Sequence, residues 1–202
     1  AEGQFERWIG GLKIEDVERE LAINGLTFQA RLALAEGATN ELEAVSAGRT
    51  VRVPVEGGIT QARDGRFGLA PKFSKNDSTA RFAEAGDFDH GEPFSYGSWV
   101  YVPENYNEYA AIFARMDRAD AGYRGWDLWI QQGQFATHII STWPGNAIKV
   151  RTNKRLAKKG AWQHVMVTYD GSGKPEGVKI YVDGVSAATE TENGAGITAS
   201  IR

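Results

Sequence analysis

Between Leu26 and Gly184 the sequence keeps returning to one pattern: short segments in which apolar and polar residues alternate, with turn residues between them. Alternation with a period of two is typical of a β-strand that is buried on one face. No segment with helical spacing interrupts this part of the chain, so the pattern predicts an antiparallel sandwich or barrel. The predicted strands are residues 26–32, 49–55, 66–73, 79–83, 93–103, 109–116, 125–131, 135–141, 147–152, 162–170 and 177–184.

The first 24 residues follow a different pattern. Apolar residues recur there at positions 5, 8, 9 and 12 and again at 14, 17 and 21, which is the spacing of one face of a helix. A chain of 202 residues suits one domain of ordinary size. We therefore expect a short helical linker or extension over residues 1–24, followed by one β-domain over residues 25–202.

Composition removes several classes of function. The net charge of −3 gives no basic face for a nucleic acid, and no apolar run approaches the roughly 18 residues of a membrane span. The chain has no cysteine, which excludes disulfides, thiolate catalysis and zinc held by sulfur. We expect neither a nucleic-acid partner nor a membrane span.

Residues 125–142 can be paired as a hairpin if Gln132 and Gly133 form its two-residue turn. The even-numbered residues of 126–130 then lie opposite the odd-numbered residues of 135–139. All but one of these six residues are apolar, which is the composition of a core face. The register therefore predicts that this side of the hairpin is buried.

The opposite face of the same hairpin is mixed. It carries Trp129 beside a cross-strand pair of Asp127 and His138, with Tyr123 near its end and Trp143 just past the second strand. A ring on such a face either packs under another segment, such as the N-terminal helix or a loop, or stacks on a ligand. These five residues are the candidate ligand-binding set.

Three segments carry a family resemblance. AWQHVMVTYDGSGKPEGVKIYVDG (161–184) resembles the signature hairpin of laminin-G-like jelly rolls, which belong to the concanavalin A-like lectin/glucanase superfamily. GRFGLAPKF (65–73) and FSYGSWVYVP (94–103) are similar to two earlier strands of that family, with Trp99 in its tryptophan position. The resemblance implies an all-β fold, an antiparallel two-sheet jelly-roll sandwich.

A narrower likeness covers residues 112–152. This segment resembles the laminin-G-like module of large exported multidomain proteins in planctomycetes, where the module sits among c-type cytochrome domains. The likeness implies an extracytoplasmic address, in the periplasm or at the cell surface, and no defined activity. The chain itself has no haem-attachment motif, and it ends at GAGITASIR, before the last strand that the family normally adds.

Catalytic patterns are missing from the sequence. Glucanases of this superfamily carry Glu-x-Asp-x-x-Glu along one strand, so that two carboxylates flank the sugar, and this chain has no such run. Asp127 and His138 suggest a triad with Ser141, but nothing here resembles a Gly-x-Ser-x-Gly turn. We therefore expect a protein that is not an enzyme, and a glycoside hydrolase is the weakest interpretation.

Calcium is the one metal that the sequence suggests, because jelly rolls of this superfamily often hold it on carboxylates at a rim. Asp87, Asp89 and Glu92 form one candidate group, and Asp117 with Asp120 forms another. No other cofactor is expected.

Together these features predict a non-catalytic binding or interaction module of an exported multidomain protein, with a polysaccharide as the candidate ligand. The alternative is a structural scaffold that docks neighbouring domains or proteins through the same face.

Overall fold

The computed structural model describes residues 25–34, 41–57, 59–66, 68–73, 78–83, 85–106 and 108–202. The chain forms two compact units, residues 1–85 and 86–202. The helical extension predicted over residues 1–24 lies outside the described residues. Among those that are described, no helix has the length and apolar character needed to cross a membrane.

The described residues of the first unit form six strands. Four make one sheet in the order β1 (Phe28–Leu34), β2 (Glu41–Ser46), β3 (Arg49–Glu56) and β6 (Thr79–Ala80). The other two, β4 (Ile59–Gly65) and β5 (Gly68–Phe73), pair with each other. The sequence pattern did not predict β2 or β4.

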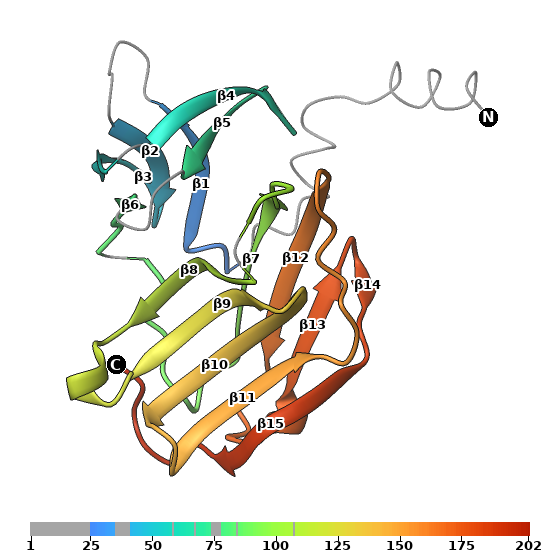
Figure 1. The fold of residues 1–202 in the computed structure, drawn as a ribbon. Helices are drawn as coiled ribbons and strands as arrows, with labels where there is room; N and C mark the ends of the chain where they lie inside the picture. Colours follow the sequence, from blue (N-terminus) through green and yellow to red (C-terminus); the bar gives the residue numbers. More distant parts are fainter. Residues whose placement is uncertain are drawn as a thin grey trace, which may run out of the picture. The chain divides into compact units, whose positions relative to one another are not determined.

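The second unit is a sandwich of two antiparallel sheets (Figure 1). The front sheet has the order β15 (Thr189–Gly196), β11 (Asn146–Thr152), β10 (Gln134–Thr142), β9 (Gly125–Gln131) and β8 (Tyr109–Met116). The back sheet has the order β14 (Val185–Ser186), β13 (Val178–Val182), β12 (Trp162–Tyr169) and β7 (Phe94–Tyr101). Two short 3-10 helices lie in loops of the second unit: η1 (Ala119–Ala121) between β8 and β9, and η2 (Pro175–Gly177) between β12 and β13. The predicted all-β jelly-roll sandwich is confirmed.

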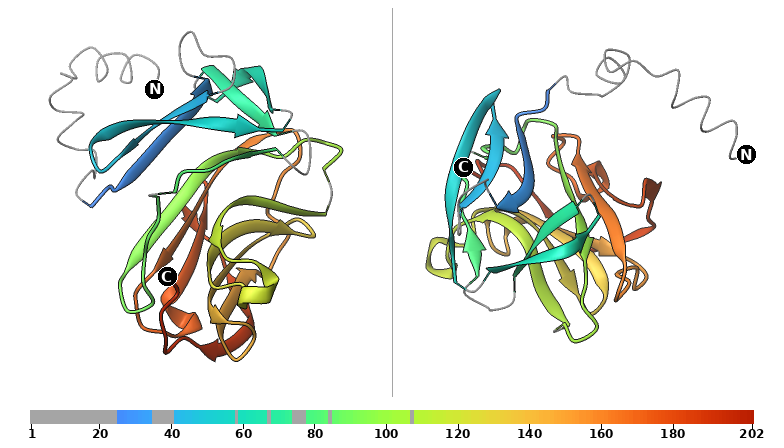
Figure 2. Two further views of the ribbon diagram at one scale, coloured as in Figure 1. Left: turned by 90° about the vertical axis from the view of Figure 1, so that its left-hand side faces the viewer. Right: turned by 90° about the horizontal axis from the view of Figure 1, so that it is seen from above.

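The core of this unit lies between the two sheets, which stand opposite each other in the left view of Figure 2. Alternate residues of each strand point into it, as the burial pattern of β12 shows, with every second residue buried. The buried apolar side chains are Phe94, Tyr96, Val102, Trp126, Leu128, Ile130, Phe135, Ile139, Ile148, Val150, Val165, Val167, Tyr169, Val178, Ile180, Ile197 and Ile201.

The predicted hairpin register is confirmed. Gln131 pairs with Gln134, and Trp126 pairs with Ile139. Gln132 and Gly133 both have positive φ, at 52° and 80°, which is the backbone of the favoured two-residue hairpin turn. The even-numbered residues of β9 therefore face the core, as the sequence predicts.

Residues 197–201, which follow β15, contact other loops of this unit. Ile197 donates its amide hydrogen to the carbonyl of Gly173 at 2.9 Å, and its side chain is buried. The amide of Ile201 and the hydroxyl of Ser200 both donate to the carboxylate of Asp89, each at 3.1 Å. This segment therefore joins the core of a unit that begins more than one hundred residues earlier.

Candidate functional site

The outer face of the front sheet collects most of the predicted ligand-binding residues. Trp129 lies on the outward side of β9, opposite Ala111 of β8 and Ala136 of β10. Both neighbours are alanines, so no large side chain stands directly beside the indole within the ladder. Trp129 is half-buried, in contrast to Trp126, which lies in the core.

Asp127 and His138 form the predicted cross-strand pair. The carboxylate of Asp127 accepts the backbone amide of His138 at 2.7 Å, and its Oδ2 lies 2.9 Å from His138 Nδ1. Because an ionised carboxylate can only accept, Nδ1 carries the proton and Nε2 is the free ring nitrogen. Nε2 has no hydrogen-bond partner in the described part of the chain. Ser141 is buried and makes no hydrogen bond to His138, so the geometry does not support a triad.

Four rings form a continuous row across this face. The ring centroids of Tyr109 and Trp129 are 6.0 Å apart, those of Trp129 and His138 are 5.4 Å apart, and those of His138 and Trp143 are 5.6 Å apart. Tyr109 and Trp143, at the two ends, are 53% and 38% exposed. We call these four residues the aromatic row.

The angle between neighbouring ring planes differs along the aromatic row. Tyr109 and Trp129 are inclined to each other by 32°, and Trp129 and His138 by 33°. Trp143 then stands at 81° to the His138 ring. Neighbouring rings among Tyr109, Trp129 and His138 are therefore moderately inclined to each other. The Trp143 ring is nearly perpendicular to that of His138.

Tyr123 lies near the Trp143 end, in the loop after η1. The backbone amide of Trp143 donates to the carbonyl of Gly122 at 3.1 Å, which holds the two loops together. Tyr123 is exposed, and its ring makes no ring contact with the aromatic row. The structure thus brings four of the five predicted residues together and leaves Tyr123 beside them.

Charged residues of β11 and β15 border the aromatic row. Lys149 lies over the Trp129 ring, with Nζ 5.2 Å from its centroid, and forms an ion pair with Glu192. Arg151 pairs with Glu190 at 2.6 Å and with Glu192 at 2.9 Å. Burial alone would raise the pKa of Glu192, but the hydrogen bond and charge of Lys149, with the charge of Arg151, hold it below its usual range.

The sequence prediction missed Tyr109 and Lys149 as members of this site. Tyr109 begins a predicted strand, but its position next to Trp129 depends on the pairing of β8 with β9. Lys149 lies opposite His138 because β10 pairs with β11. Pairing the predicted strands 109–116 and 147–152 with the hairpin would have been the signal that located both residues.

The first calcium candidate group is occupied by other contacts. Asp87 forms an ion pair with Arg115 at 3.0 Å, and Glu92 forms one with Arg202 at 3.1 Å. Asp89 accepts hydrogen bonds from the amides of His90 and Ile201.

In the second group, Asp120 lies 3.9 Å from Arg118. The amide of Asp117 donates to the carbonyl of Arg124. Within the described residues, no three acidic, histidine or cysteine side chains gather as a metal site would need. Calcium stays a prediction that these contacts do not support.

The outer face of the back sheet carries a second set of aromatic residues. Trp99 lies opposite His164 with ring centroids 5.4 Å apart, and Tyr101 lies opposite Trp162 at 5.6 Å. Trp99 and Tyr101 are 37% and 45% exposed. These residues are on the opposite side of the sandwich from the aromatic row.

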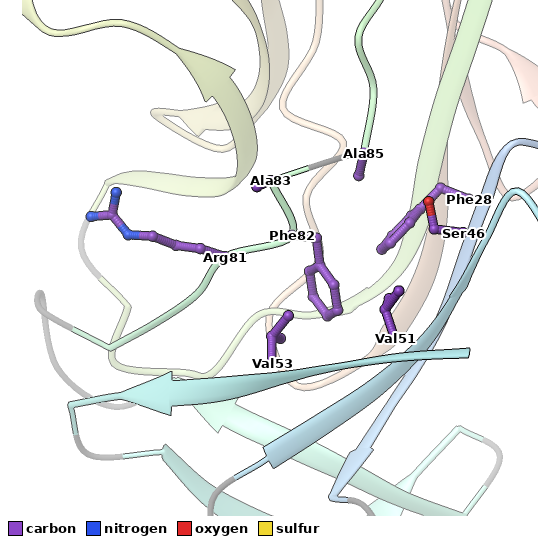
Figure 3. A pocket seen from close by; sticks show the side chains of 8 residues that line it. All are labelled: Phe28, Ser46, Val51, Val53, Arg81, Phe82, Ala83 and Ala85. Atoms are coloured by element: carbon purple, nitrogen blue, oxygen red, sulfur yellow. The ribbon is translucent and has the colours of Figure 1, made fainter. Parts of the chain in front are cut away.

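The first unit holds a small pocket of about 210 Å³. Figure 3 shows Phe28 and Phe82 meeting edge to face inside it, with ring centroids 5.0 Å apart, and Arg81 extending away from them. The remaining lining residues are Ser46, Val51, Val53, Ala83 and Ala85. The lining is mostly apolar, with Ser46 and Arg81 as its polar residues.

The second unit thus has the architecture of a jelly-roll domain with a mixed aromatic and polar outer face. The chain belongs to the Concanavalin A-like lectin/glucanases superfamily, whose sequence pattern matches residues 74–200. No curated protein matches the chain. One similar solved structure is the crystal structure of the botulinum neurotoxin serotype G binding domain, with 16% identity and a TM-score of 0.49. The alignment covers 71% of this chain and 37% of that one.

Proposed function

We propose that this protein is a non-catalytic module that binds a polysaccharide on the outer face of its front sheet. The aromatic row is the observation that supports this proposal. A sugar ring has an apolar C–H face and a polar rim, so it suits ring faces that are flanked by hydrogen-bonding groups. Trp129 and Trp143 supply the faces, while Asp127 and His138 supply polar atoms between them.

The charged groups beside the row favour binding over hydrolysis. A glycosidase needs an acid and a free carboxylate on either side of one sugar. Here Asp127 is bonded to His138, and Glu192 is held ionised by Lys149 and Arg151. Both carboxylates are therefore engaged by neighbouring side chains of the same face, which favours a binding role.

The test is a titration calorimetry panel of cellohexaose, laminarihexaose, xylohexaose and mannohexaose, repeated with Trp143→Ala. Trp143 is exposed at the end of the row, so its removal should leave the fold intact and weaken binding by about tenfold. Trp99→Ala is the matched control, because Trp99 has nearly the same exposure on the opposite sheet and should leave binding unchanged.

Two results would contradict the proposal. One is that no sugar of the panel binds, and the other is that Trp143→Ala binds as tightly as the unchanged protein. Release of reducing ends during the same incubations would show a hydrolase instead.

A second candidate function is the docking of a neighbouring domain or protein. The exposed Trp99 and Tyr101 on the back sheet favour it, because aromatic residues are enriched in protein interfaces. The paired change Trp99→Ala and Tyr101→Ala should abolish co-sedimentation with adjoining domains of the parent protein. Trp143→Ala should leave that association intact.

An extracytoplasmic address, in a large exported multidomain protein, is part of the same proposal. Its support is the resemblance of residues 112–152 to the modules of exported planctomycete proteins. Fractionation of the native cells, followed by detection with an antibody, should find the protein in the periplasm or at the cell surface.

A further inference from the structure

We infer that the ligand of the aromatic row is an uncharged sugar chain, and that one of its hydroxyl groups is held between Trp129 Nε1 and Gln131 Oε1. This inference rests on the proposed function, because it specifies how the same face recognises its ligand.

Among the residues that the structure describes, two buried polar atoms of this face have no hydrogen-bond partner. They are Trp129 Nε1 and Gln131 Oε1. The two residues are two positions apart on β9, so both side chains stand on the outward side of the strand. A buried polar atom without a partner is costly, and native proteins satisfy almost all of them. These two atoms therefore point to a bound group that the protein itself does not provide.

The orientation of the Gln131 amide is fixed by Glu192. Gln131 Nε2 donates to Glu192 Oε1 at 3.3 Å, and Glu192 is an ionised carboxylate that can only accept. The nitrogen of the amide must therefore face Glu192, which leaves the oxygen as the unpaired acceptor. Trp129 Nε1 is a donor only. The unpaired atoms are thus one donor and one acceptor.

A hydroxyl group matches this pair, because it accepts one hydrogen bond and donates another. A carboxylate or sulfate could accept from Trp129 but could not donate to Gln131. An ammonium group could donate to Gln131 but could not accept from Trp129. Among the groups of a ligand, a hydroxyl therefore satisfies both atoms, whereas a charged group satisfies only one of them.

The charges around the row argue for an uncharged ligand. Lys149 lies over the Trp129 ring and Arg151 shares its partner Glu192, so both cations are already paired with Glu190 or Glu192. An anionic sugar would have to compete with these carboxylates for the same cations. A neutral sugar leaves the ion pairs in place.

Tyr109 is the side chain that can admit the ligand. It lies directly opposite Gln131 in the ladder, its ring is next to Trp129, and it is the most exposed member of the row. A change of the Tyr109 rotamer is therefore the movement by which a sugar would reach these two atoms.

The experiment compares Trp129→Phe and Gln131→Met by calorimetry against the four neutral hexaoses and against oligogalacturonate. Trp129→Phe keeps an aromatic face and removes the N–H, and Gln131→Met keeps the length and removes the acceptor. Each change should weaken binding of the neutral sugar by about tenfold. Trp99→Phe is the matched control and should leave binding unchanged, because Trp99 lies on the opposite sheet with nearly the same exposure as Trp143.

A spectroscopic readout separates hydrogen bonding from stacking. The indole N–H signal of Trp129, assigned by its loss in Trp129→Phe, should move to lower field when the sugar is added. Thermal unfolding of each variant should show that the fold is kept.

The outcomes distinguish the two proposals. If Trp129→Phe and Gln131→Met bind normally while Trp143→Ala loses binding, the hydroxyl site is wrong and the polysaccharide-binding function stands. Tighter binding of oligogalacturonate than of every neutral hexaose would overturn the uncharged ligand. If no sugar binds, or if Trp143→Ala binds normally, both proposals fail.

Discussion

At the scale of single residues, the carboxylate of Asp89 connects the first residues of the second unit to residues 200 and 201. Its two oxygens accept from the amides of His90 and Ile201 and from the hydroxyl of Ser200. Burial alone would raise the pKa of Asp89, but these hydrogen bonds, together with one to the His90 ring, hold it well below its usual range. The ionised form is therefore the one that the folded protein stabilises.

This gives a prediction for acid stability. Because the pKa of Asp89 is lower in the folded state than in the unfolded chain, its contribution is complete above about pH 4 and is lost as the pH falls toward the folded value. Asp89→Asn should lower the free energy of unfolding at pH 7 and should flatten its decline between about pH 4 and pH 2. Urea unfolding at several pH values measures this.

Asp120→Asn is the control for that experiment. Asp120 is 78% exposed, and its contact with Arg118 is long, so both stability and its dependence on pH should stay close to those of the unchanged protein. An equal effect of the two substitutions would show that Asp89 has no special role.

At the scale of strands and sheets, a hydrogen-bonded chain crosses the core between the front and back sheets. The hydroxyl of Tyr96 in β7 lies 2.5 Å from Thr137 Oγ1 in β10, and the two hydroxyls lie 3.2 and 2.7 Å from the carbonyl oxygen of Asp127 in β9. Both side chains are buried, and burial raises the pKa of Tyr96, so the hydroxyl stays protonated. These hydrogen bonds hold the front and back sheets in one fixed position relative to each other.

A double-mutant cycle tests these hydrogen bonds. Tyr96→Phe should cost about 1–2 kcal/mol, and Thr137→Val should cost about the same, because each removes a hydrogen bond within a buried group of three. The double variant should be less destabilised than the sum of the two by about 1 kcal/mol. Additive losses in chemical denaturation would show that the two hydroxyls act independently.

Strands with a clear apolar alternation could be predicted from the sequence, and strands without one could not. The register of β9 and β10 was predictable because Gln132 and Gly133 set the turn and the apolar residues alternate on one side only. Strand β15 was not predictable, because its sequence, TETENGAG, has no apolar alternation. Its glutamates instead reach Lys149 and Arg151 across the sheet, and such partners become visible only once β11 is placed beside it.

Only those residues of the candidate site that lie in or next to one hairpin could be predicted from the sequence. Trp129, Asp127 and His138 belong to one hairpin, so a local pattern places them on one face. Tyr109, Lys149 and Gln131 belong to the site through pairing between strands and through a hydrogen bond to Glu192. Contacts of this kind depend on tertiary arrangement and leave no local signal.

At the scale of the whole molecule, the apolar core of the jelly roll lies entirely within residues 86–202. A chain of these residues alone should therefore fold and unfold in one cooperative transition. Circular dichroism during heating and the dispersion of amide signals in an NMR spectrum would show this. A broad transition with collapsed amide signals would mean that the core needs residues 1–85.

The contacts of Asp89 have a consequence for how this unit can be joined to other proteins. Asp89 lies three residues after the unit begins, and Ile201 is the second-last residue of the chain, yet an oxygen of one is 3.1 Å from the amide of the other. Residues 89 and 200–201 of this unit therefore lie side by side. A segment cut at these two neighbouring points can be spliced into a loop of a host domain, or circularly permuted by a short linker that joins them.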